Sequence, residues 1–189
     1  ARMIRAEGLC EWSGLGSLEG SRGEIAAAAR KIKKTMGKHA RVVFLPELAL
    51  AVLKRLRWLG VLSPQLRNVP LLEHLQKGIP TERFSLLPYW RKSRPAPAEN
   101  LDPVRDRCGL IWCSPVIPMT AEDTRRFLEI SRTRIEATGF EYNVSLNLVT
   151  ERAIDCTIAI VFDGEDEEDR RRAEACDENL AAALRAAGY

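Results

Sequence analysis

Residues 141–162 read EYNVSLNLVTERAIDCTIAIVF, and this stretch decides the fold. Two runs rich in β-branched and apolar residues, 141–149 and 153–162, flank a short polar segment at residues 150–152. This pattern is typical of two strands joined by a tight turn, which makes them antiparallel. Period-two alternation places Ser145 and Asn147 on the same face of the first strand.

The segments around this hairpin predict further elements of the second half. Residues 108–116 have the apolar composition of a buried strand. A helix is expected from residue 120 to 138, because Thr120 is followed three residues later by an acidic residue and Gly139 ends the pattern. A last helix begins within an acidic run at residues 165–169, where carboxylates favour the helix N-terminus.

The first half follows the same plan. Strands are expected at residues 9–19 and 41–45, and helices at 22–36 and 47–59. Residues 61–106 hold seven of the ten prolines, which indicates a lid-like excursion or a boundary between two halves. The sequence therefore predicts an α+β fold with an antiparallel or mixed sheet covered by helices, built of two ferredoxin-like half-units.

Composition and charge exclude several classes of protein. No window approaches 18 apolar residues, so no membrane span is predicted, and the first residues show no signal peptide, which favours a cytoplasmic chain. The net charge of +3 conceals a basic half: residues 1–94 hold 18 Lys and Arg against 7 Asp and Glu. Nucleic acid is not expected as a partner, because these basic residues are scattered and no aromatic pair lies on a central strand.

The five cysteines and two histidines do not indicate a metal site. The cysteines form no CxxC pair, and two histidines are too few for the usual zinc spacings. We therefore expect reduced thiols and no metal.

Two aromatic positions suggest a pocket. Tyr89 and Trp90 precede two cations in the proline-rich segment, which suits either packing against a ligand ring or anchoring this loop to the domain. Trp112 lies within an apolar strand, where it serves the core or lines a cavity.

Five stretches, in their order and spacing, resemble the substrate-side cap of the FAD-linked family of vanillyl-alcohol oxidase and 4-cresol dehydrogenase (the p-cresol methylhydroxylase flavoprotein). These stretches are residues 11–20, 78–80, 89–92, 109–116 and 139–162. The resemblance covers essentially the whole chain. It implies that residues 1–189 form a single cap domain, and that the FAD-binding domain and a catalytic Tyr-Arg pair lie outside this chain.

The resemblance also implies a set of substrate-binding residues. Trp112 corresponds to an aromatic pocket wall, and Ser145, Asn147 and Thr157 correspond to positions on the strands that line the substrate side. Tyr89 is a further candidate. The parent enzyme would oxidise 4-alkylphenols or 4-hydroxybenzyl alcohols by hydride transfer to FAD, and the fragment alone is expected to be inactive.

One position departs from the family. Leu110 occupies the place of a histidine that is bonded covalently to the flavin in vanillyl-alcohol oxidase, and leucine cannot form that bond. The resemblance therefore implies FAD held without a covalent link at Leu110.

The partners implied are the FAD-binding domain of the same enzyme and a phenolic small molecule, with either oxygen or a cytochrome c as electron acceptor. Apolar surface left where that domain docks would favour a homodimer. The alternative is a stand-alone ligand-binding or protein-interaction domain derived from such an enzyme.

Overall fold

The computed structural model describes residues 12–58, 74, 77–80, 82–97 and 99–189. These residues belong to two compact units, 1–81 and 82–189. The division falls inside the proline-rich middle segment, as one of the two interpretations of that segment predicted. In the part that the structure describes, no helix is long and apolar enough to cross a membrane.

The described part of the first unit includes α2 (Arg22–Met36) and α3 (Glu47–Trp58), both close to the predicted bounds. The start of α2 is fixed by a capping box. The Ser21 N–H donates to Glu24 Oε2 over 2.8 Å, and the Glu24 N–H donates to Ser21 Oγ over 3.4 Å. This reciprocal pair satisfies two backbone donors that a helix end otherwise leaves free.

The two strands predicted in the first unit are not formed by the described residues. Residues 12–19 and 41–45 are assigned to neither strand nor helix. A strand requires a neighbour that accepts and donates ladder hydrogen bonds, and within the described residues neither segment has one. Local composition at residues 41–45 fits a strand, but composition alone does not supply the partner.

The second unit is organised around one central strand, β4 (Ala153–Asp163). On one side β4 pairs antiparallel with β3 (Val144–Leu148), its hairpin partner. On the other side it pairs antiparallel with β1 (Cys108–Cys113) and β2 (Val116–Pro118). All three strands predicted in this half therefore form, the first of them as β1 and β2, and the α+β fold with an antiparallel sheet is confirmed.

β1 and β2 are one strand interrupted at Pro115. The register with β4 is the same on both sides of the break, because Cys113 lies opposite Ile158 and Val116 lies opposite Asp155. Across the break, the Cys156 N–H still donates to the Pro115 carbonyl over 2.9 Å. Proline has no N–H to return the second bond of this pair, so the ladder is weakened at that residue without a change of register.

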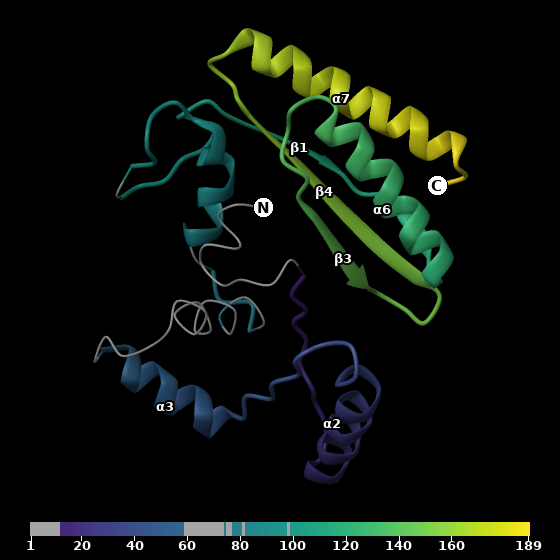
Figure 1. Ribbon diagram of the computed structural model, residues 1–189. Coiled ribbons are helices and arrows are strands. Elements are labelled where there is room, and N and C mark those ends of the chain that lie inside the picture. Colours follow the sequence, from purple (N-terminus) through teal and green to yellow (C-terminus); the bar gives the residue numbers. More distant parts are fainter. Residues whose placement is uncertain (1–11, 59–73, 75–76, 81, 98) are drawn as a thin grey trace. The chain divides into compact units, whose positions relative to one another are not determined.

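Two helices cover one face of this sheet, α6 (Ala121–Glu136) and α7 (Glu167–Ala186) (Figure 1). Thr120 caps α6 through its Oγ1, which accepts from the Asp123 N–H, and Asp166 caps α7 in the same way. The core between sheet and helices includes Ile117, Phe127, Ile135, Phe140, Ile154, Cys156, Ile158, Ile160, Phe162, Ala173, Cys176, Leu180 and Leu184.

Candidate functional site

The face of the sheet opposite α6 and α7 carries a different set of side chains. Even-numbered residues of β4 point into the core, so the odd-numbered ones point to the other face. These are Asp155, Thr157, Ala159 and Val161. We call this surface the open face of the sheet.

The antiparallel register identifies the neighbours on the open face, because residues directly opposite each other share a face. The pairs are Leu110 with Val161, Trp112 with Ala159, Ser145 with Thr157, and Asn147 with Asp155. The structure therefore brings five of the residues singled out in the sequence onto one surface. Their roles in binding substrate and cofactor stay predictions.

Side-chain hydrogen bonds agree with this placement. The Asn147 amide lies 3.3 Å from Asp155 Oδ2 and 3.4 Å from Thr157 Oγ1, so it bridges two residues of the adjacent strand. Asn147 is thus held in one orientation by the strand beside it. The result is a small polar cluster of amide, carboxylate and hydroxyl groups on the open face.

Next to this polar cluster lies apolar surface. The Trp112 side chain is 65% exposed, and Val116, opposite Asp155, is 61% exposed. A large aromatic side chain left in the open on a well-formed sheet marks a surface suited to contact another group. Trp112 therefore belongs to the open face and not to the core, which decides between the two interpretations of its strand.

The other end of the open face is covered. η1, a 3-10 helix (Glu82–Arg91), packs against β4 and β1. Ala159 and Val161 are buried even though they point away from α6 and α7. The covering by η1 leaves the end around Asp155 and Asn147 accessible.

Tyr89, the remaining predicted site residue, lies in this covering segment. Its hydroxyl donates to Asp106 Oδ2 and accepts from the Asp102 N–H over 3.0 Å. Burial, together with the bond to Asp106, raises the pKa of Tyr89 to about 12. These contacts of Tyr89 anchor the loop, whereas Trp90, expected to serve as the anchor, is 56% exposed. The Tyr89 hydroxyl already uses both its donor and its acceptor.

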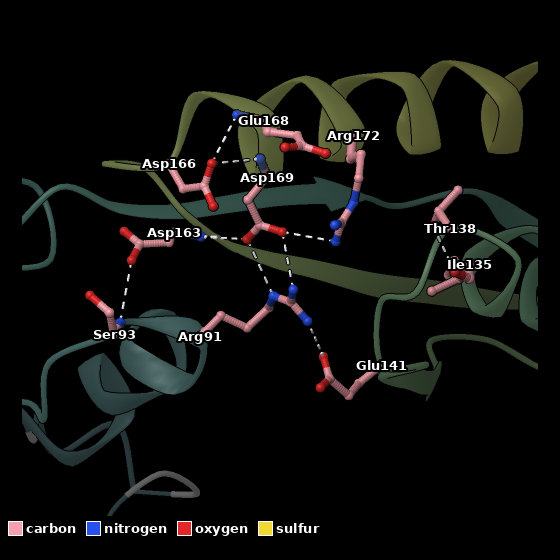
Figure 2. A network of polar contacts seen from close by, with 10 residues as sticks. All are labelled: Arg91, Ser93, Ile135, Thr138, Glu141, Asp163, Asp166, Glu168, Asp169 and Arg172. Atoms are coloured by element: carbon pink, nitrogen blue, oxygen red, sulfur yellow. Dashed lines mark hydrogen bonds and ion pairs between the residues drawn. The ribbon is translucent and has the colours of Figure 1, made fainter.

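Arg91 and Lys92 fasten η1 to the end of the sheet and the start of α7. Figure 2 shows the contacts of Arg91. Arg91 donates from Nη2 to Asp169 Oδ1 over 3.0 Å and from Nε to Oδ2 over 3.3 Å. Lys92 Nζ lies 2.8 Å from Asp163 Oδ1 and 2.7 Å from Glu165 Oε2. We call these ion pairs the clamp.

Asp169 accepts more hydrogen bonds than the other carboxylates of the clamp. In addition to Arg91, its oxygens accept from Arg172 Nη2 over 2.9 Å and from the Asp163 N–H over 2.9 Å. The residue is only 6% exposed. Its charge is therefore balanced by two guanidinium groups at a buried position, where a missing partner is costly.

The clamp makes stability depend on pH. Burial alone would raise the pKa of Asp163 and of Asp169, but the hydrogen bonds from Lys92 and Arg91 reverse this and leave both pKa values below normal. A lowered pKa in the folded state contributes stability that is present above the unfolded value of about 3.9 and lost as pH falls through the folded value.

We expect the free energy of unfolding to fall steeply below about pH 4 and to be lower by about 1–3 kcal/mol in Lys92→Met at pH 7. The variant should also lose less stability on acidification, because the pKa of Asp163 is then no longer lowered by Lys92. Urea unfolding between pH 7 and pH 3 measures both effects. Lys38→Met, at an exposed lysine of the first unit, is the control; equal pH slopes in wild type and Lys92→Met would contradict the assignment.

Asp155 is a functional candidate that the sequence analysis missed. It lies two residues before Thr157, so period-two alternation already places both on the same face. Its bonding to Asn147 could not be foreseen, because this required the hairpin register.

The other surface features lie elsewhere. A shallow hollow lined by Arg126, Glu129, Ile130, Thr133, Arg134, Ala183, Ala186 and Ala187 is formed by α6 and α7, away from the open face. Within the described residues, no group of three or more His, Cys, Asp and Glu side chains is arranged to hold a metal ion.

Comparison with known proteins finds similar proteins among both curated sequences and solved structures. No protein-family model matches the chain. The chain is 36% identical over 197 residues to 1'-carboxy-chondrochloren decarboxylase of Chondromyces crocatus. The aligned region covers all of this chain and 36% of that protein. The fold of this chain matches the crystal structure of p-cresol methylhydroxylase with substrate bound, with a TM-score of 0.69 and 17% identity. The match covers 100% of this chain and 31% of that chain.

These matches confirm, at the level of fold, the resemblance found in the sequence. The chain spans about a third of the length of each protein that it matches. The whole fold of this chain therefore corresponds to one part of a larger protein in both cases.

Proposed function

From the fold that this chain shares with p-cresol methylhydroxylase, we propose that residues 1–189 are the substrate-binding cap of an FAD-dependent oxidoreductase acting on a para-substituted phenol. The observation that carries the proposal is the open face. Trp112, Ser145, Asn147 and Thr157 share one face of the sheet, and Trp112 is exposed on it. An aromatic surface beside a few fixed polar groups is the usual composition of a small-molecule site.

The residues present fit the ring end of a flavin and not its phosphates. Trp112 offers flat apolar contact on the open face, and Leu110, which is half-buried toward the end that η1 covers, has no atom that could bond to the ring covalently. Within the described residues of this face there is no lysine or arginine to bind a pyrophosphate. FAD, when bound, supplies the hydride acceptor, and its phosphates would be held by the FAD-binding domain of the same enzyme.

The contribution of this chain to the reaction is positioning and exclusion of water. Trp112 packs against the phenol ring, while the hydroxyl groups of Ser145 and Thr157 and the amide of Asn147 hydrogen-bond to its polar substituents. A phenol held in this way presents its benzylic carbon in a fixed orientation, which accounts for a large part of enzymatic rate enhancement. Residues 1–189 alone are expected to show no turnover.

A second reaction is favoured by the curated relative. That protein is named as a decarboxylase of a carboxylated compound, and it is 36% identical to this chain. The same flavin-dependent hydride removal, followed by loss of carbon dioxide from the substrate, would give a decarboxylated product. The two candidates differ in substrate, because only the second requires a carboxylate.

The complete enzyme that contains this chain tests both. It is mixed anaerobically with 4-methylphenol, 4-hydroxybenzyl alcohol or 3-(4-hydroxyphenyl)propanoate, and bleaching of the flavin absorbance is followed together with release of carbon dioxide. Bleaching by the first two compounds supports oxidation, and carbon dioxide from the third supports decarboxylation. If no phenol alters the flavin spectrum, the proposed function is wrong.

Trp112→Ala should raise KM for the phenol by about 10-fold to 100-fold, because the truncation removes the aromatic surface that the ring contacts. Steady-state kinetics of the complete enzyme measure the change. Trp90→Ala is the matched control, since Trp90 is also exposed, at 56%, but lies on η1. Equal effects of the two substitutions would contradict the role of Trp112.

A further inference from the structure

We infer that Asp155 selects the substrate by the charge of its para substituent, favouring a hydrogen-bond donor or a cation and disfavouring a carboxylate. The inference rests on the first of the two proposed reactions, oxidation of a phenol, and deepens it by naming the class of phenol; the second reaction, which requires a carboxylate on the substrate, would contradict it. It is carried by the position of Asp155, its partners and the absence of a compensating charge.

Asp155 lies at the accessible end of the open face. It is paired with Val116 on one side and Asn147 on the other, both exposed. The carboxylate is therefore flanked by one apolar and one neutral polar side chain. A ligand that covers this end of the face would meet a negative charge directly.

The partners of Asp155 leave much of its capacity unused. Oδ2 accepts from the Asn147 amide over 3.3 Å, and within the described residues no lysine, arginine or histidine forms an ion pair with this carboxylate. A carboxylate can accept several hydrogen bonds and donates none when ionised. The remaining acceptor sites can thus bind a donor on a ligand.

Asp163, on the same strand, shows what a structural aspartate of this sheet looks like. It accepts from Lys92 Nζ, the Ser93 N–H and the Glu165 N–H, and it is buried. Within the described residues Asp155 forms no ion pair with a cation, and it is only half-buried. This contrast separates a carboxylate that holds the fold together from one left available for a ligand.

The distance from Trp112 indicates the length of the substituent. Trp112 lies opposite Ala159, four residues along β4 from Asp155, which corresponds to about 13 Å of strand. A phenol ring that contacts Trp112 reaches Asp155 only through a substituent several atoms long. The substrate class is therefore a phenol whose para chain carries an amine, amide N–H or hydroxyl group.

Electrostatics gives the direction and size of the selection. Two like charges about 4 Å apart at a partly desolvated surface repel strongly, while opposite charges attract by a similar amount. Solvent at this accessible end weakens both effects. We expect a preference of about 10-fold to 100-fold for a cationic over an anionic chain of the same length.

The test uses the complete flavin-containing enzyme and three phenols with para chains of similar length. These are 4-(5-aminopentyl)phenol, 4-hexylphenol and 6-(4-hydroxyphenyl)hexanoate, whose chains are long enough to extend from a ring at Trp112 to Asp155. Dissociation constants are measured from the change in flavin absorbance, at pH 7 and low ionic strength. In the wild type the amine should bind most tightly and the acid least tightly.

Asp155→Asn should abolish the difference between amine and acid and should change the binding of 4-hexylphenol, whose chain carries no charge, by less than about 3-fold. Asp155→Glu should keep the order of the three ligands. Glu151→Gln, at an exposed carboxylate in the β3–β4 turn, is the control and should match the wild type.

Two results would overturn the inference: a wild type that does not distinguish amine from acid, or an Asp155→Asn variant that still does. Both leave the proposed function standing if 4-hexylphenol binds. If none of the three phenols binds to the wild type, the proposed function itself fails and the inference fails with it.

Discussion

Replacing Asp169 by alanine should lower the free energy of unfolding of residues 82–189 by about 3–5 kcal/mol. The substitution leaves the buried Asp163 N–H and the Arg172 guanidinium without this acceptor, and Arg91 keeps Glu141, at 3.3 Å. The cost is large because the Asp163 N–H and the Arg91 side chain, which is only 22% exposed, lose an acceptor at a site where water replaces it poorly.

Urea unfolding followed by circular dichroism measures this loss. Glu168→Ala is the matched control, since Glu168 is the preceding residue of α7 and is exposed. Its substitution should change the free energy of unfolding by less than about 0.5 kcal/mol. A loss below 1 kcal/mol in Asp169→Ala would mean that the clamp does not hold η1 in place.

Phe127→Ala should have an effect of similar size, a loss of about 3–5 kcal/mol. Phe127 is fully buried between α6 and the rest of the core, and its ring meets that of Tyr189 edge to face, with centroids 6.4 Å apart and an interplanar angle of 85°. Truncation removes buried apolar area and leaves a cavity, and the two costs add.

Thermal and urea unfolding of the variant check this expectation. Leu148→Ala is the control, because Leu148 is 67% exposed at the end of β3 and loses little buried area. If both variants unfolded at the same urea concentration, the core would not be centred on the layer between the sheet and α6.

The second half of the fold was predictable because its signals are local. Alternation, the short polar turn and the caps of the helices each depend on residues near one another in sequence. They gave the strands at residues 108–116, 141–149 and 153–162 almost in place. The same alternation put Ser145 and Asn147 on one face before any pairing was known.

What could not be predicted depends on residues far apart. Arg91 and Asp169 are separated by 78 positions, and no local pattern marks them as partners. The strand expected at residues 41–45 is wrong among the described residues for the same reason, since a ladder partner is a long-range requirement. Asp155 was not predicted because its importance depends on having no cation beside it among the described residues, which only the structure shows.

The central place of β4 has a consequence for the order of events during synthesis. Each of the other strands pairs with β4, yet β4 is the last strand of the unit to leave the ribosome. β1 must wait for about 45 further residues before its partner exists, whereas β3 waits only for a turn. We expect the hairpin of β3 and β4 to form first and β1 to join later, since short loops close at the lowest entropic cost. Until residue 163 has emerged, the nascent chain exposes the apolar side of β1, and α6 has only part of the sheet on which to pack.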